Sequence, residues 1–183
     1  EGEIIAQESI LSPKQYLGYE LGEQFTYHHK VVDYYNYIAQ NSSQVKLKTY
    51  GQTVERRPLV AAIISSEENI KRLEEIRTNN LKTTGLIEGT VSQKLLPIVW
   101  LSYNIHGDEA AGTEAALKTI YHLITNLKAQ EWLKEVVIII DPCENPDGRD
   151  RYTNWYNQVV NKITTSNEKS IEHHQPWPRG RFN

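Results

Sequence analysis

A histidine and a glutamate three positions apart are the residues of this sequence best suited to metal chemistry. His106 and Glu109 belong to the segment 104–109, which reads Asn-Ile-His-Gly-Asp-Glu. Neutral imidazole nitrogens and carboxylate oxygens both bind Zn²⁺ at about 2.0–2.2 Å, and Gly107 allows the chain to turn both side chains toward one point. A catalytic zinc usually takes three protein ligands and keeps one position for water, so this pair would supply two of the three. The alternative is that Glu109 is an ordinary acidic residue at a helix start and His106 a loop residue.

The segment 141–151 is the second stretch whose side chains point to a binding role. It reads Asp-Pro-Cys-Glu-Asn-Pro-Asp-Gly-Arg-Asp-Arg, in which Asn-Pro and Asp-Gly are turn dipeptides. A planar guanidinium binds a carboxylate through two parallel hydrogen bonds, so Arg149 or Arg151 would suit a substrate carboxylate, with Asn145 on the rim of the same site. The alternative is a turn without chemistry, followed by a solvated run of charges.

Alternating helix and strand patterns place both segments at one edge of a sheet. Apolar spacing predicts helices over 28–40, from 66 to about 79 and over 109–128, and strands over 45–50, 59–64, 95–103 and 136–140. The two late strands are apolar on both faces, which is typical of a buried α/β sheet with helices on both faces. Ligands bind at the carboxyl ends of the strands in such sheets, and segments 104–109 and 141–151 each follow one of these strands.

Composition limits the classes of protein to consider. The chain has 183 residues, of which 39% are hydrophobic and 23% charged, and this balance indicates a globular domain rather than a disordered segment. A net charge of −3 argues against non-specific nucleic-acid binding, and no stretch reaches the roughly 18 to 20 apolar residues of a membrane span. Cys143 is the single cysteine, so a metal site must be built from histidines and carboxylates. Residues 1–27 lack periodicity and are expected to be an irregular lead-in to a domain over 28–183.

Several motifs in order give the sequence a family resemblance. His106 to Glu109, after an apolar strand, is followed by a helix, a second apolar strand and the Asn-Pro-Asp-Gly segment 145–148. This order resembles the zinc carboxypeptidase family of metallopeptidases, as does the stretch 50–59 with its Gly-x-Thr-x-Glu-x-Arg pattern. The stretches 17–22 and 172–178 resemble a bacterial branch of that family.

The resemblance implies a fold, a metal and an activity. It implies an eight-stranded, mixed and mostly parallel sheet between helices, one Zn²⁺, and hydrolysis of C-terminal peptide bonds in a peptide or protein substrate. His106 and Glu109 match two zinc ligands of the family. The third ligand, the pair that binds the substrate carboxylate and the general-base glutamate are expected beyond Asn183, so the chain would be the N-terminal part of a truncated, inactive catalytic domain. His173 and His174 are the in-chain alternatives for a third ligand. Family members of this type are often exported, so we expect a secreted or periplasmic protein.

Two other functions remain open at this level. A zinc amidohydrolase of the aspartoacylase and succinylglutamate desuccinylase type shares a His-Gly-x-Glu start. A non-catalytic binding domain on the same scaffold is the second alternative, because the family's carbonyl-polarising arginine would fall within 157–160 and no arginine is there. A truncated sheet would also leave a strand edge or an apolar face bare, which predicts dimerisation or poor solubility.

Overall fold

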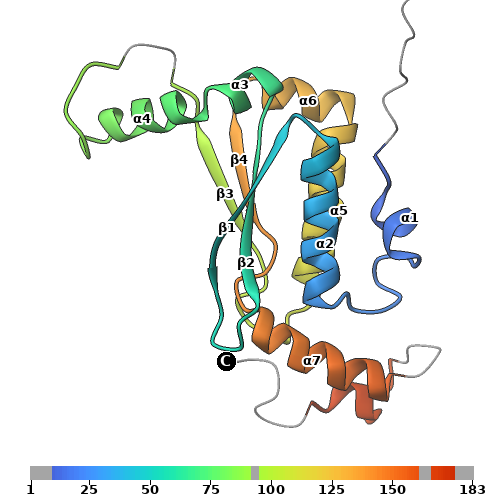
Figure 1. Cartoon of the computed structure of the whole chain (residues 1–183). Helices are drawn as coiled ribbons and strands as arrows, with labels where there is room; N and C mark the ends of the chain where they lie inside the picture. Colours follow the sequence, from blue (N-terminus) through green and yellow to red (C-terminus); the bar gives the residue numbers. More distant parts are fainter. Residues whose placement is uncertain (1–9, 92–94, 161–165, 176–183) are drawn as a thin grey trace, which may run out of the picture.

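A four-stranded sheet forms the centre of the computed structural model, which describes residues 10–91, 95–160 and 166–175 (Figure 1). Its strands are β1 (Val45–Gln52), β2 (Pro58–Ile64), β3 (Ile98–Ser102) and β4 (Val137–Asp141). The helices are α1 (Pro13–Leu17), α2 (His28–Asn41), α3 (Glu67–Lys71), α4 (Leu73–Thr83), α5 (Ala111–Thr125), α6 (Leu127–Leu133), α7 (Pro146–Val159) and the 3₁₀ helix η1 (Ile171–His173). The strand order is β1-β2-β4-β3.

The sheet is mixed, as the sequence predicts, but its pairing differs in detail from a mostly parallel sheet. Among the described strands, β1 pairs with β2 and β2 with β4 in antiparallel fashion, and only β3 and β4 run parallel. The short loop between β1 and β2 makes them a hairpin, and a hairpin is antiparallel by construction. The parallel pair is the one that a helical connection, α5 with α6, joins.

Local capping chemistry decides where several helices begin. The predicted helix over 109–128 is instead two helices, because the Asn126 side chain accepts a hydrogen bond from the Ala129 backbone N–H and starts α6. The turn predicted at 145–148 is instead the beginning of a helix. Asn145 is the N-cap of α7, with Pro146 in its first turn, and this combination begins a 14-residue helix. The expected irregular lead-in holds a short helix, α1, that the Ser12 side chain caps; residues 1–9 lie outside the described residues.

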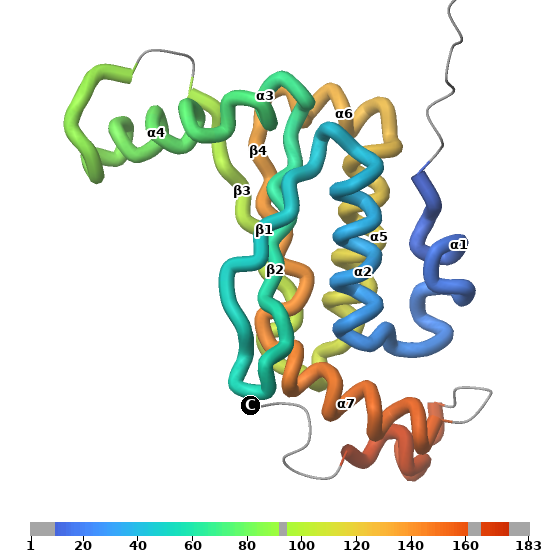
Figure 2. Tube along the Cα trace, viewed as in Figure 1, coloured from blue at the N-terminus to red at the C-terminus, as the bar shows by residue number. Residues whose placement is uncertain are grey.

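One face of the sheet carries the hydrophobic core. Helices α2 and α5 stand side by side against this face, with α6 continuing from α5 (Figures 1 and 2). The core includes fully buried side chains from α2, β2, β4 and α5, among them Val31, Tyr35, Ile38, Ile64, Leu117, Ile120 and Ile140. Burying each large aliphatic side chain stabilises the fold by about 1.5–3 kcal/mol, so this layer holds the sheet in place.

The opposite face of the sheet is covered by α4 at one end, and among the described residues the rest of this face is exposed. Within the described residues, Ile76 of α4 and Leu96 pack there against Val137 of β4, and α4 otherwise extends away from the sheet (Figure 1). The predicted strand 95–103 is not buried, since Trp100 is 66% exposed and Ile98 41% exposed. Both lie on β3, which forms one edge of the described sheet.

The parallel pair brings the two polar segments together at its carboxyl end. Ser102 of β3 is in register with Asp141 of β4. Beyond them, the backbone N–H of Asn145 donates to the carbonyl oxygen of Asn104 at 3.2 Å. The predicted proximity of segments 104–109 and 141–151 is therefore confirmed. No helix in the described part of the chain has the length and apolar character needed to span a membrane.

We expect the isolated chain to self-associate through its bare apolar face. Substitution Trp100→Glu should raise the dissociation constant of the dimer at least tenfold, because it puts a charge into the surface that would be buried. Trp132→Glu is the matched control, since Trp132 is 54% exposed on α6, away from the bare face. Sedimentation velocity over a concentration series measures both. A wild-type chain that stays monomeric at high concentration would contradict this expectation.

Candidate metal centre

The loop between β3 and α5 turns His106 and Glu109 toward each other. The backbone N–H of Glu109 donates to the carbonyl oxygen of His106 at 3.1 Å, which closes a tight turn. The left-handed residue of this loop is Asn104, with φ of 58°, a conformation that asparagine adopts more readily than most residues. Glu109 precedes α5 rather than opening it, because α5 begins at Ala111. The turn predicted at Gly107 is confirmed, since Gly107 and Asp108 are the central residues of the turn that this hydrogen bond closes, and the positive φ of the loop falls on Asn104.

The two side chains meet at a distance that suits a shared zinc ion. His106 Nδ1 and Glu109 Oε1 are hydrogen-bond partners 3.2 Å apart. Two ligand atoms about 2.0–2.1 Å from a tetrahedral zinc are about 3.3 Å apart, so the observed separation fits two ligands of one ion. The side chains are 36% and 56% exposed, and an ion can reach them from solvent.

The pair stands without a third ligand in the part of the chain that the structure describes. No group of three or more His, Cys, Asp or Glu side chains in residues 10–91, 95–160 and 166–175 is arranged to hold a metal ion. His173 and His174 lie at η1 and do not join His106 and Glu109 in such a group. Of the stretch 172–178, residues 176–178 lie outside the described residues.

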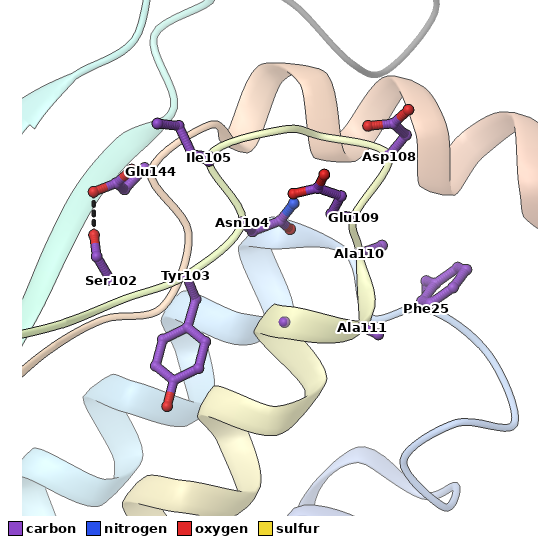
Figure 3. Close-up of a pocket in the computed structure, with 11 residues that line it drawn as sticks. Phe25, Ser102, Tyr103, Asn104, Ile105, Asp108, Glu109, Ala110, Ala111 and Glu144 are labelled. Atoms are coloured by element: carbon purple, nitrogen blue, oxygen red, sulfur yellow. Dashed lines mark hydrogen bonds between the residues drawn. The ribbon is translucent and has the colours of Figure 1, made fainter.

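A pocket of about 620 Å³ lies beside the loop at the carboxyl end of β3. Figure 3 shows its wall, which carries Asp108 and Glu109 from the loop and Glu144 from the segment after β4. The Ser102 hydroxyl donates a hydrogen bond to the Glu144 carboxylate. Three acidic side chains therefore line this pocket.

Arg149 lies in a different place from the one expected of a substrate-binding residue. Its side chain is fully buried and forms an ion pair with Glu114, with Nη2 2.6 Å from Oε1. It is not among the residues that line the pocket. A substrate carboxylate would have to displace these buried partners to reach the guanidinium, so the burial argues against the predicted substrate contact of Arg149, which stays a prediction.

Asn145 and Arg151 are engaged within the protein. The Asn145 side chain accepts a hydrogen bond from the Gly148 backbone N–H at 2.9 Å and so caps the N-terminus of α7. Arg151 forms an ion pair with Glu55 in the loop between β1 and β2. Neither residue lines the pocket, and a substrate contact for Arg151, which is 37% exposed, stays a prediction.

A charged network joins two motifs that the sequence shows about ninety positions apart. Arg57 contacts Asp147 through Nη1 at 2.7 Å and Asp150 through Nε at 2.8 Å. The Thr53 hydroxyl also donates to Asp147, at 2.7 Å. The Gly-x-Thr-x-Glu-x-Arg stretch therefore fastens the β1–β2 hairpin to the start of α7. The motifs alone do not predict this pairing, because contacts between distant segments depend on the tertiary fold.

Asp141 is a further polar residue of this region that the sequence pattern does not single out. Burial raises the pKa of its carboxyl group, against the opposing hydrogen bonds from the Tyr50 hydroxyl and the Cys143 backbone N–H. Burial also raises the pKa of the Cys143 thiol to about 12, so this thiol stays protonated and unreactive at neutral pH.

The comparisons with known proteins agree with this architecture. A family model described as zinc carboxypeptidase matches residues 31–181, which is most of the chain, and the chain therefore belongs to the zinc carboxypeptidase family. Its assignment to a bacterial branch stays a prediction. A comparison with curated proteins finds no match.

Two solved structures share the fold. Carboxypeptidase A from Helicoverpa armigera is similar with a TM-score of 0.52 and 19% identity, over 78% of this chain and 29% of that one. Thrombin activatable fibrinolysis inhibitor is similar with a TM-score of 0.50 and 16% identity, over 77% of this chain and 29% of that one. At these identities the likeness concerns the fold alone. The chain spans about 29% of the length of these two structures.

Acidification should weaken the network around Asp147. Burial alone would raise the pKa of this carboxyl group, but hydrogen bonds from Thr53 and Arg57 outweigh burial and hold the pKa below its usual value. Such a group stabilises the fold above its unfolded pKa of about 3.9, and the stabilisation is lost as the pH falls through the lower folded pKa. Asp147→Asn should therefore lower the free energy of unfolding at pH 7 by about 1–3 kcal/mol.

Urea unfolding at pH 7 and in steps toward pH 2 measures this effect. The difference between wild type and Asp147→Asn should shrink as the pH falls. Glu74→Gln is the control, because Glu74 pairs with Arg77 on the exposed surface of α4 and should change stability very little. A difference that is the same at every pH would show that the Asp147 charge does not stabilise the fold.

Proposed function

We propose that the protein containing this chain is a zinc metallocarboxypeptidase, in which His106 and Glu109 are two of the zinc ligands. Its substrates would be peptides or proteins, from which it removes C-terminal residues. The observation that carries the proposal is the 3.2 Å approach of His106 Nδ1 to Glu109 Oε1 at the carboxyl end of the parallel strand pair. Membership of the zinc carboxypeptidase family supports the reaction type.

The described residues define what this part of the protein would contribute. His106 offers a ring nitrogen and Glu109 offers a carboxylate, and the charge of the carboxylate offsets part of the charge of a divalent cation. When bound, a zinc ion would polarise the carbonyl group of the bond to be cleaved and lower the pKa of a bound water. The adjoining pocket, with Glu109 in its wall, gives space for a substrate chain beside the ion.

The other catalytic groups of the proposed enzyme are not among the described residues. We expect the third ligand, the residues that bind the substrate carboxylate and the general base beyond Asn183. The isolated chain should therefore bind zinc weakly and release no amino acids from peptides. The longest protein that carries this chain is the right material for an activity assay.

Replacement of either ligand should abolish tight zinc binding in that protein. His106→Ala and Glu109→Ala should each weaken zinc affinity more than 100-fold, since even changes to groups outside the ligand shell cost roughly 10–100-fold. His122→Ala is the matched control, because His122 lies near the end of α5 and away from the loop. Competition with a chromophoric chelator measures the affinities.

Activity separates the peptidase from the other zinc hydrolases. The zinc-loaded protein should release C-terminal residues from short peptides, and His106→Ala should not. Hydrolysis of N-acyl amino acids without peptide cleavage would instead indicate an amidohydrolase. Zinc affinity that survives both ligand substitutions would contradict the proposed site.

A further inference from the structure

Arg149 makes an unusually complete set of buried contacts at the start of α7. Its guanidinium is fully buried and pairs with Glu114 of α5. Nε and Nη2 also donate to the carbonyl oxygen of Thr26, at 3.0 and 2.8 Å. A buried charge persists only where it is paired and its donors are satisfied, and both conditions hold here.

The remaining nitrogen, Nη1, reaches the two ends of the loop that carries the candidate ligands. It donates to Asn104 Oδ1 at 2.8 Å and to the carbonyl oxygen of Ala110 at 2.6 Å. Asn104 and Ala110 enclose the segment that contains His106 and Glu109. One planar group therefore fixes the distance between the start and the end of this loop.

Asn104 connects Arg149 to the backbone of His106, the first candidate ligand. Its Nδ2 donates to the carbonyl oxygen of His106 at 2.5 Å, while its Oδ1 accepts from Arg149. The Thr113 hydroxyl of α5 also lies 2.9 Å from Asn104 Oδ1 and shares its one proton between this oxygen and the carbonyl oxygen of Pro142 at 2.7 Å. The Asn104 side chain is thus held on one side by two buried donors and holds the His106 backbone on the other.

We propose that Arg149 is the positioning residue of the zinc loop, acting through Asn104 and Ala110 to bring His106 and Glu109 to a common point. This inference rests on the proposed function, because it concerns the same two ligands. The planar guanidinium is essential to this role. A lysine ammonium at position 149 would keep the charge but could not reach Thr26, Glu114 and both ends of the loop from one rigid group.

Two conservative variants test this role. One keeps the charge of the original side chain and the other keeps its shape, so that the protein is expected to fold. Arg149→Lys keeps the positive charge beside Glu114 and loses the rigid fork. Asn104→Asp keeps the side-chain shape and an acceptor for Arg149, loses the Nδ2 donor to His106 and adds a negative charge that Arg149 faces. Arg57→Lys is the matched control, since Arg57 also fastens α7 through Asp147 and Asp150 but has no contact with the loop.

The measurements are amide hydrogen exchange without metal and zinc affinity by chelator competition, in the longest protein that carries the chain. Arg149→Lys and Asn104→Asp should each speed exchange at residues 105–110 at least tenfold, with exchange in β4 unchanged. Each should also weaken zinc affinity about 10–100-fold, as is typical for partners that orient metal ligands. Arg57→Lys should lower the melting temperature without either effect.

The outcomes separate this inference from the proposed function. If Arg149→Lys and Asn104→Asp fold and match the wild type in loop exchange and zinc affinity, Arg149 does not position the loop, although the zinc site itself can stand. If Arg149→Lys does not fold, Asn104→Asp decides by the same two measurements. If zinc affinity does not depend on His106 in the wild type, the proposed function fails, and loop exchange alone decides whether Arg149 holds the segment.

Discussion

The ion pair between Arg149 and Glu114 is the interaction on which the architecture of the site depends. Both side chains are almost completely buried, and such a pair is costly to desolvate and more costly still to break, with a loss of about 3–5 kcal/mol when one partner is removed. Its hydrogen bonds reach the lead-in at Thr26 and both ends of the loop between β3 and α5. The pair therefore fixes four separate segments of the chain relative to one another.

The charged side chains at the start of α7 point in two directions. Arg149 points into the protein toward the loop, whereas Asp147 and Asp150 face Arg57 of the β1–β2 hairpin. Asn145 and Pro146 begin α7 shortly after β4 ends. The charged side chains of Asp147, Arg149 and Asp150 therefore lie beside the carboxyl end of the parallel strands. The Asn-Pro-Asp-Gly segment thus acts as a structural joint, and the adjacent loop supplies the groups that suit a metal.

The sequence predicts the parts of this structure that depend on local patterns. The approach of His106 to Glu109 and the alternation of helices and strands follow from spacing and from the placement of polar segments after apolar strands. The burial of Arg149 does not, because an Arg-Asp-Arg run looks like a solvated surface until its distant partner Glu114 is known. The exposure of Trp100 does not follow from the sequence either, since an apolar strand has the same pattern whether or not another layer covers it.

The central claim is that His106 and Glu109 share one zinc ion, and anomalous diffraction at the zinc absorption edge tests it most directly. Crystals of the zinc-loaded protein should show one strong anomalous peak within about 2.0–2.2 Å of both His106 Nδ1 and a Glu109 carboxylate oxygen. A peak bound to neither side chain, in a protein that holds zinc with one-to-one stoichiometry, would contradict the account.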